Sequence, residues 1–340
     1  GPERKLAART ILIATGSRPT HAPGIPFDDL AVYDSDRIYA IRDAPQDIVI
    51  VGGGPVGVEF ATVFTALGIP VTLVSQAERL LPTMDGELAG LMADEFARRG
   101  VTLILGHGVD GVVRSEERLR VTLRSGAVLT SDVVLFAAGR TPNTQELGLA
   151  EAGVQLDARG RIVVDRYYRT TAAGIYAAGD VVGPTLASTA MQQGRAAACH
   201  ACGLVFGVEV DQAASSAVYS LPEVAGVGAT EEQVRSMGLP YVVGRCDLAT
   251  TARGAIAGHG GRLKLIFRAD NRKLLGVHCI GDSASEVVAL GHLALHVGST
   301  VELFLTLALN TPTYSAAYHD AVMDGLARLA ERMDYEPATA

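Results

Sequence analysis

The segment IVIVGGGPVGVEF, residues 48–60, decides the fold of this 340-residue chain. Its first four residues, Ile48–Val51, are all apolar and β-branched, which predicts a buried strand. Three glycines follow, and a helix is predicted from Val58 to about Leu67, with Gly68 as its stop signal. A strand that runs through a glycine-rich turn into a helix is the first half of a βαβ unit.

The glycines of this turn have the spacing Gly52-x-Gly54-x-x-Gly57. In such a turn the first glycine permits the tight bend, the second lets the backbone approach a pyrophosphate, and the third lets the helix pack close to the strand. The helix N-terminus adds free N–H groups and the positive end of the helix dipole. Because a strand precedes the turn and a helix follows it, the segment predicts a dinucleotide-binding site.

The same alternation continues along the chain. We expect strands at 71–74, 101–105 and 133–136, and an amphipathic helix at 85–99. Strands that alternate with helices form a doubly wound parallel sheet, so the fold class is α/β and Rossmann-like. An earlier apolar run, ILIA within residues 10–14, is expected to be a buried strand.

The pattern changes after Ala217. Strands are expected at 225–227, 241–245, 263–267 and 274–280, followed by helices at 285–296 and 313–330. Strands in succession followed by helices are typical of an α+β domain, so we expect a separate C-terminal domain.

The end of the strand at 71–74 bears on the choice of coenzyme. A site for NAD alone normally places Asp or Glu there to bind the ribose hydroxyls, whereas this chain has Ser75 and Gln76. Neither side chain would repel a 2′-phosphate, and Arg79, one turn further on, could bind it; an ordinary surface position for Arg79 remains the alternative. We expect a site that accepts both NAD and NADP.

Composition and charge exclude several classes of partner. The net charge is −8 and no basic run is present, which argues against nucleic acid. The apolar stretch at 301–309 contains Glu302 and is too short to cross a bilayer, so no membrane partner is expected. Residues 1–5 lead into a strand pattern without the features of a signal peptide, and we expect a cytoplasmic location.

No metal site is predicted. Four cysteines in a chain of this length do not form a disulfide framework. Cys199 and Cys202 have CxxC spacing, but a zinc site needs a second pair at a suitable distance. His292 and His296 are four residues apart without the glutamate that follows the first histidine of a zincin.

Four motifs in a fixed order resemble those of the pyridine nucleotide–disulfide oxidoreductase superfamily. They are ATGSRP (14–19), GGGPVGVE (52–59), AAGRTPN (137–143) and YAAGD (176–180). Residues 217–327 resemble its dimerisation domain. The resemblance implies an FAD-binding domain in two parts, an NAD(P)-binding domain inserted between them, and an α+β dimerisation domain. The expected boundaries are 1–44 and 139–212 for the FAD domain, 45–138 for the NAD(P) domain and 213–330 for the dimerisation domain.

The resemblance also implies which residues bind the cofactors. Thr15 and Gly16 are expected against the FAD, Asp180 is expected to accept hydrogen bonds from the ribityl hydroxyls, and Gly139 and Arg140 are expected where the chain returns to the FAD domain. The full set of expected cofactor-binding residues is Thr15, Gly16, Gly52, Gly54, Pro55, Val56, Gly57, Glu59, Ser75, Gln76, Arg79, Gly139, Arg140, Gly179, Asp180, Leu186 and Ala187.

Two positions near the end of the chain bear on the reaction. The disulfide reductases of this superfamily carry a redox cysteine pair early in the chain and, late in the chain, a His-Pro-Thr sequence with a following glutamate; the histidine moves protons to the thiol. Here Thr311 stands at the histidine position and Ala316 at the glutamate position. Neither is an acid or base near neutral pH, so thiol chemistry at this flavin is not expected.

Hydride transfer alone remains, and several segments resemble the soluble, FAD-dependent, Si-specific NAD(P) transhydrogenases. They are GPTLASTAMQQGR (183–195), YSLPEVAGVGATEEQ (219–233) and LLGVHCIGDSASEVV (274–288). The resemblance implies that NADPH passes a hydride to FAD and that NAD then takes it at the same site. It further implies a homodimer in which Thr311 and Pro312 approach the flavin of the partner subunit. Ala316 departs from this branch, which is expected to keep an acid there.

Two other functions stay open at this point. One is a dihydrolipoamide dehydrogenase-like or mercuric reductase-like disulfide reductase that has lost its histidine. The other is a nucleotide-binding fragment without catalysis. The chain has one complete G-x-G-x-x-G, whereas an FAD domain of this superfamily needs its own, so we expect a missing N-terminal segment of roughly a hundred or more residues.

Overall fold

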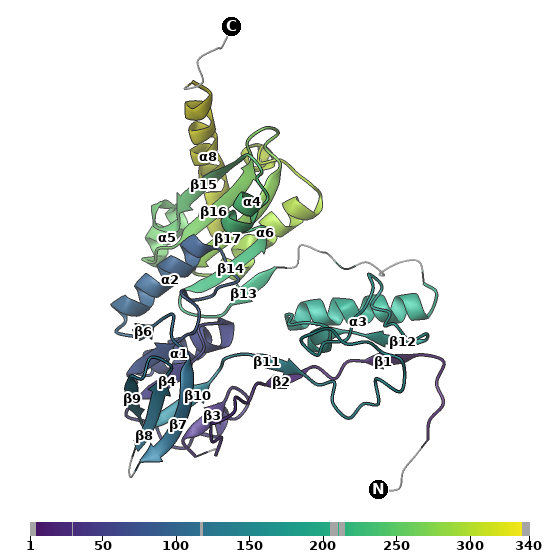
Figure 1. Ribbon diagram of the computed structural model, residues 1–340. Coiled ribbons are helices and arrows are strands. Elements are labelled where there is room, and N and C mark those ends of the chain that lie inside the picture. Colours follow the sequence, from purple (N-terminus) through teal and green to yellow (C-terminus); the bar gives the residue numbers. More distant parts are fainter. Residues whose placement is uncertain (1–4, 29, 116–117, 205–209, 211–214, 335–340) are drawn as a thin grey trace. The chain divides into compact units, whose positions relative to one another are not determined.

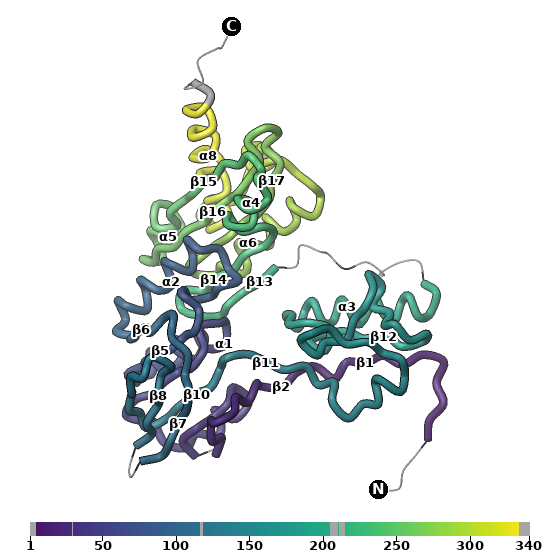
Figure 2. Tube along the Cα trace, viewed as in Figure 1, coloured from purple at the N-terminus to yellow at the C-terminus, as the bar shows by residue number. Residues whose placement is uncertain are grey.

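The computed structural model describes residues 5–28, 30–115, 118–204, 210 and 215–334. The chain forms two compact units. The first unit contains Gly1–Thr20 and Gly139–Gln212, and the second contains His21–Ala138 and Ala213–Ala340. The chain therefore passes between the units three times (Figure 2). The expected boundary between Gln212 and Ala213 falls outside the described residues.

The second unit contains a five-stranded parallel sheet (Figure 1), and the glycine-rich turn follows the central strand of this sheet. Its strands lie in the order β3 (Val32–Asp34), β10 (Val133–Phe136), β4 (Ile48–Val51), β5 (Val71–Val74) and β6 (Thr102–Ile104). Every residue of β4 and β10 is buried, because a central parallel strand is covered on both faces. This explains why their sequences are continuous apolar runs and do not alternate with polar residues.

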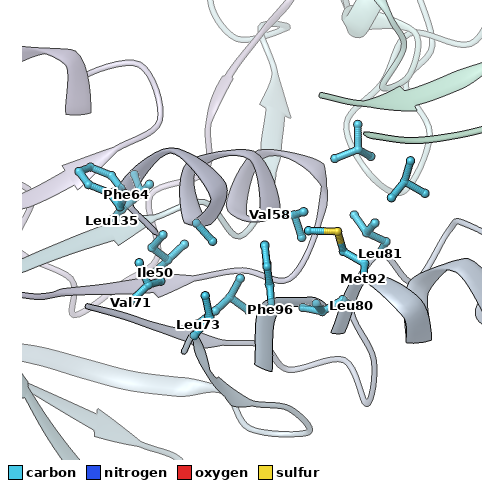
Figure 3. Packing of buried hydrophobic residues seen from close by; sticks show 14 of the residues in the cluster. Ile50, Val58, Phe64, Val71, Leu73, Leu80, Leu81, Met92, Phe96 and Leu135 are labelled. Atoms are coloured by element: carbon cyan, nitrogen blue, oxygen red, sulfur yellow. The ribbon is translucent and has the colours of Figure 1, made fainter. Parts of the chain in front are cut away.

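Different elements cover the two faces of this sheet. Helices α1 (Pro55–Ala66) and α2 (Gly86–Arg98) pack on one face, where Val58, Phe96 and Met92 meet the alternate strand residues Ile50 and Leu73 (Figure 3). The other face holds Val49, Val51 and Val134 against a three-stranded antiparallel sheet. That sheet consists of β7 (Val109–Ser115), β8 (Arg118–Leu123) and β9 (Val128–Ser131).

The boundary expected at residue 44 lies inside the second unit. Residues 21–44 belong to the second unit, because β3 pairs with β10 from Val32↔Val134 to Asp34↔Phe136. A short 3-10 helix, η1 (Ile38–Ala40), then leads into β4. A three-residue strand carries little periodicity, and its pairing with a strand a hundred residues later in the chain is a tertiary fact.

The C-terminal part of the second unit is an antiparallel sheet with helices, as expected for an α+β domain. Its strands lie in the order β13 (Ser216–Val218), β14 (Glu223–Gly228), β17 (Leu274–Gly281), β16 (Arg262–Arg268) and β15 (Tyr241–Asp247). The other elements are α4 (Glu231–Ser236), η3 (Leu248–Thr250), α5 (Ala252–Ala257), α6 (Ala284–His296), α7 (Leu303–Thr306), η4 (Tyr314–Ala316) and α8 (Ala317–Asp334). The fold class predicted from the sequence is confirmed.

The first unit is smaller and is built from two-stranded pairs. Strand β1 (Ile11–Ile13) runs parallel to β12 (Ile175–Ala177), and β2 (Ser17–Pro19) runs antiparallel to β11 (Arg140–Pro142). A 3-10 helix, η2 (Gly179–Val181), and α3 (Ala187–Ala201) follow β12. The expected burial of the ILIA strand is wrong: Ile11 and Leu12 are 51 % and 42 % exposed, because the described residues pair β1 with β12 alone.

Candidate functional site

The glycine-rich turn has the geometry of a phosphate-binding loop. Gly52 has φ of +128°, and a Cβ there would lie 2.4 Å from the carbonyl oxygen of Ala137. A Cβ on Gly57 would lie 1.8 Å from the carbonyl oxygen of Gly52, so the helix can come this close to the strand only because residue 57 is a glycine. Gly57 thus lies at the close approach of helix and strand that the sequence predicted, and the positive φ of Gly52 fits the tight bend predicted there.

Gly54 differs from its neighbours because a Cβ there would meet nothing within 4 Å. It is also the N-cap residue of α1, and no side chain accepts a hydrogen bond from the first turn. The helix begins at Pro55, three residues earlier than predicted, with proline at a position that needs no N–H. An uncovered glycine before uncapped helical N–H groups fits the pyrophosphate of a dinucleotide.

The loop after β5 lies against the glycine-rich turn. The Leu81 N–H donates to the carbonyl oxygen of Gly53 over 2.8 Å, and the buried Ser75 hydroxyl would be 2.7 Å from a Cβ on Gly53. Ser75 Oγ also accepts the Ala77 N–H, at 3.2 Å, while Gln76 is exposed. The ribose side of the turn therefore carries no carboxylate at position 75 or 76.

The Arg79 guanidinium is directed toward α2 and α4. It donates to the carbonyl oxygens of Pro82 and Met84 at 3.0 and 3.1 Å, and to Glu232 Oε1 at 3.4 Å. Sequence reasoning missed Glu232, which lies 153 residues away in the chain and carries no local signal. The expected contact of Arg79 with a 2′-phosphate stays a prediction.

Glu59 joins the nucleotide-binding half of the second unit to its C-terminal half. The Glu59 carboxylate accepts the N–H of Tyr219 at 2.9 Å. Tyr219 follows β13 and has an exposed side chain. Pro55 is exposed and Val56 is half-buried, so these expected site residues border the open side of α1.

A buried charge cluster fixes the start of α2. Lys264, which is 1 % exposed, places Nζ 2.9 Å from Asp85 Oδ1 and 2.6 Å from Glu231 Oε2. Asp85 is fully buried and its side chain caps α2 by accepting the Glu87 N–H. Burial opposes the charge of these carboxyls, but His278 and then the Lys264 ammonium lower the pKa of Asp85, and the Lys264 ammonium lowers that of Glu231.

The expected flavin-binding residues of the first unit come together around Ser17. The Ser17 hydroxyl donates to Asp180 Oδ2 at 2.6 Å, and Arg140 Nε donates to Ser17 Oγ at 2.8 Å. Thr15 Oγ1 donates to the carbonyl oxygen of Asn143 at 2.7 Å, and the backbone oxygen of Gly16 accepts the Asn143 N–H at 2.9 Å.

A cavity of about 150 Å³ opens beside Asp180. Its lining residues are Ser17, Arg140, Pro142, Arg159, Arg161, Asp180 and Pro184. Gly139 has φ of +131°, where the chain enters this unit, and Gly179 donates its N–H to Gln193 Oε1 at 2.8 Å. Leu186 and Ala187 begin α3 at its N-cap and first position. The sequence named these positions but not Ser17, whose place in ATGSRP was the available signal.

The two positions at which the disulfide reductases carry an acid–base pair hold neither an acid nor a base here. Thr311 and Pro312 are exposed, and Ala316 is half-buried at the end of η4. The Thr313 hydroxyl donates to the carbonyl oxygen of Asn310 at 2.6 Å. The side chains at positions 311 and 316 therefore cannot exchange protons near neutral pH, as the sequence indicated.

Among the described residues, no group of three or more His, Cys, Asp or Glu side chains could hold a metal ion. Cys199 and Cys202 are free thiols on and just after α3. The helices of the described residues also include none that is long and apolar enough to cross a membrane.

Two known protein-family profiles match this chain. The profile of "Pyridine nucleotide-disulphide oxidoreductase" matches residues 1–194, and that of its dimerisation domain matches residues 214–322. The chain belongs to the pyridine nucleotide-disulphide oxidoreductase family. It is therefore a flavin-dependent oxidoreductase with FAD and NAD(P) as cofactors, as the sequence predicted.

Two members of this family with similar sequences are both named soluble pyridine nucleotide transhydrogenase. The soluble pyridine nucleotide transhydrogenase of Colwellia psychrerythraea is 38 % identical over 97 % of this chain and 72 % of its own length. That of Pectobacterium atrosepticum is 37 % identical over 95 % of this chain and 70 % of its own length. The resemblance to this branch of the family is thus borne out.

Solved structures of the family have the same fold. LpdA from Mycobacterium tuberculosis superposes with a TM-score of 0.87 at 30 % identity, over 92 % of this chain and 69 % of its own. The Cu(II) complex of the HOCl-induced flavoprotein disulfide reductase RclA from Escherichia coli superposes with a TM-score of 0.86 at 28 % identity, over 93 % of this chain and 72 % of its own.

Proposed function

We propose that this chain carries the NAD(P)-binding and dimerising parts of a soluble NAD(P) transhydrogenase, in which hydride passes from NADPH to FAD and then to NAD. The observation that carries the proposal is Thr311, which stands where the disulfide reductases of the family have their proton-transferring histidine; Ala316 supplies no acid or base at the glutamate position either. The names of the two similar transhydrogenases support it. A disulfide reductase would need an acid–base group that these positions do not supply.

The residues of the second unit have defined roles in this proposal. Gly52, Gly54 and Gly57 bind the dinucleotide pyrophosphate at the N-terminus of α1. Ser75 and Gln76 place no carboxylate at the end of β5, so that one site accepts both coenzymes. Acceptance of both is necessary because the two half-reactions would use the same site in turn.

The residues of the first unit hold the flavin. When bound, FAD supplies the chemistry that accepts and returns a hydride. We assign Asp180 to the ribityl hydroxyls, because its carboxylate accepts the Ser17 hydroxyl and has further lone pairs to share. Thr15, Gly16 and Gly139 would allow close approach of the backbone to the cofactor.

The assembly and location are part of the proposal. Residues 214–322 match the dimerisation domain, and we infer a homodimer in which Thr311 and Pro312 face the partner subunit's flavin. Sedimentation at micromolar concentration as a monomer would contradict that assembly. We place the protein in the cytoplasm, where both nicotinamide coenzymes are substrates.

Visible absorption tests the reaction. The chain is mixed with FAD, desalted, and followed under anaerobic conditions while NADPH and then NAD are added. We expect a retained flavin band that NADPH bleaches and NAD restores, and we expect no turnover of a disulfide substrate such as lipoamide. A retained flavin that NADPH leaves oxidised would refute the proposed function, and loss of the flavin on desalting would assign this chain only the nucleotide-binding part.

A further inference from the structure

The loop between β5 and α2 brings a cation close to the phosphate-binding turn. Leu81 is hydrogen-bonded to Gly53 of that turn, and Ser75 lies beneath the same glycine. In the sequence, Arg79 lies two residues before Leu81 and four residues after Ser75. A long side chain that starts here can reach the ribose side of a dinucleotide held by Gly52–Gly57.

The guanidinium is instead held by the carbonyl oxygens of Pro82 and Met84, at 3.0 and 3.1 Å from Nη2, and by the carboxylate of Glu232, which is the charged partner among them. Glu232 comes from α4, in the C-terminal half of the second unit. Its Oε1 lies 3.4 Å from Arg79 Nη1 and also accepts the Gly86 N–H at 3.0 Å. The Glu232 carboxylate therefore stays in place at the start of α2 whether or not Arg79 remains bound to it.

A phosphate can displace the ion pair between Arg79 and Glu232, and water can replace the two backbone carbonyls that Arg79 gives up at the same time. The two side chains are 37 % and 47 % exposed, and ion pairs of this exposure are weak. A 2′-phosphate carries close to two negative charges and offers two oxygens to the planar guanidinium, which makes a stronger pair than a single carboxylate oxygen at 3.4 Å. Glu78, whose carboxylate lies over Gly106 at the end of β6, adds a second negative charge beside the same loop.

We propose that Glu232 sets the preference between NAD and NADP by competing with the 2′-phosphate for Arg79. NAD binds with Arg79 still on Glu232, whereas NADP draws the guanidinium across the loop. Because of this competition, the affinity for NADP is lower than it would otherwise be and becomes more similar to the affinity for NAD. Similar affinities suit a site that must bind and release both coenzymes. This inference rests on the proposed dinucleotide site at Gly52–Gly57.

Binding of 2′,5′-ADP and 5′-AMP, measured by calorimetry at one moderate salt concentration, separates the phosphate effect from binding in general. Glu232→Gln keeps an oxygen for the Gly86 N–H but removes the charge. We expect it to tighten 2′,5′-ADP about two- to fivefold and to leave 5′-AMP unchanged. Arg79→Ala is expected to weaken 2′,5′-ADP and, in the double variant, to abolish the effect of Glu232→Gln.

A matched control removes the general effect of charge. Asp94→Asn deletes one exposed carboxylate from α2, away from Arg79, and should leave the ratio of the two affinities as it is in the unmodified chain. An unchanged ratio in Glu232→Gln, or an equal tightening in Asp94→Asn, would overturn the inference. If the unmodified chain bound neither nucleotide, the proposed dinucleotide site itself would fail. A normal melting temperature of Glu232→Gln keeps its result free of folding effects.

Discussion

Replacement of Lys264 by methionine tests whether the buried charge cluster holds the nucleotide-binding and C-terminal halves of the second unit together. The Lys264 ammonium lies between three carboxylates: Nζ is 2.9 Å from Asp85, 2.6 Å from Glu231 and 3.2 Å from Glu87. Methionine keeps the unbranched shape of the side chain and removes only the charge and its donors. The variant therefore leaves negative charges in the protein interior without their shared cation.

The expected loss of stability in Lys264→Met depends on which partners the carboxylates keep. Glu87 keeps Arg245 and Arg262, at 2.9 and 3.1 Å, so its charge stays compensated. Asp85 is fully buried and would keep the backbone N–H groups of Glu87 and Glu231, with His278 as the titratable neighbour that can still offset its charge. Breaking a buried pair by removal of one partner costs about 3–5 kcal/mol, so we expect the free energy of unfolding to fall by that amount. This is a large share of the roughly 5–15 kcal/mol that stabilises a folded domain.

Urea unfolding followed by far-ultraviolet circular dichroism and tyrosine fluorescence measures the loss, since the chain has ten tyrosines and no tryptophan. Lys273→Met, the same substitution at an exposed lysine, is the control and should change stability by less than about 1 kcal/mol. Asp85→Asn keeps the helix cap, and in Lys264→Met it should restore about 1–3 kcal/mol. A loss below about 1 kcal/mol for Lys264→Met, or strict additivity of the two changes, would refute the reasoning.

Gly54→Ala places a methyl group where a pyrophosphate would lie and where the protein has no atom within 4 Å, so NAD binding measured by calorimetry should weaken about tenfold or more while the melting temperature stays unchanged. The control Gly90→Ala, on the exposed side of α2, should leave NAD binding intact and add about 0.5–1 kcal/mol of stability. Equal NAD affinity of the unmodified chain and both variants would contradict this site. Burial lowers the pKa of His278 below 6.5, against the pull of Asp85 and with the help of Lys264, so the neutral ring stabilises the fold fully above pH 6.5 and this contribution is lost as the pH falls below that value. Unfolding free energies measured across this range should decline toward acid pH in the unmodified chain and less steeply in His278→Gln; parallel curves would show that another group titrates.

The acid limb of the same stability curve reports on Glu87. Burial favours the neutral form of this carboxyl, but the hydrogen bond from Arg245 and the charge of Lys264 prevail, and its pKa lies at about 2 instead of 4.5. A carboxyl with a lowered folded pKa stabilises the fold above its ordinary pKa, and this contribution is lost as the pH falls from about 4.5 toward 2. The Lys264→Met curve should therefore lose less stability over this range than that of the unmodified chain.

The local sequence pattern predicted those strands and helices that an apolar run or a helix cap marks in the sequence. The strands at Ile48–Val51, Val71–Val74 and Val133–Phe136 have the bounds expected from their apolar runs. The helix after Asp85 begins where a capping side chain precedes an amphipathic pattern. Short strands such as β3 were missed, since three residues carry too little periodicity to be recognised.

The sequence by itself determined the parallel nucleotide-binding sheet, the glycine-rich turn and the lack of an acid–base pair at Thr311 and Ala316, because each depends on residue type at a fixed spacing. Only the tertiary structure decided that β1 is exposed, that Ser17 joins Asp180 to Arg140, and that Glu232 holds Arg79. These facts depend on which distant segments the folded backbone brings within a few ångströms of one another. Local propensity and spacing do not encode that information, since an ion pair between residues 153 positions apart leaves no mark on the residues around either partner.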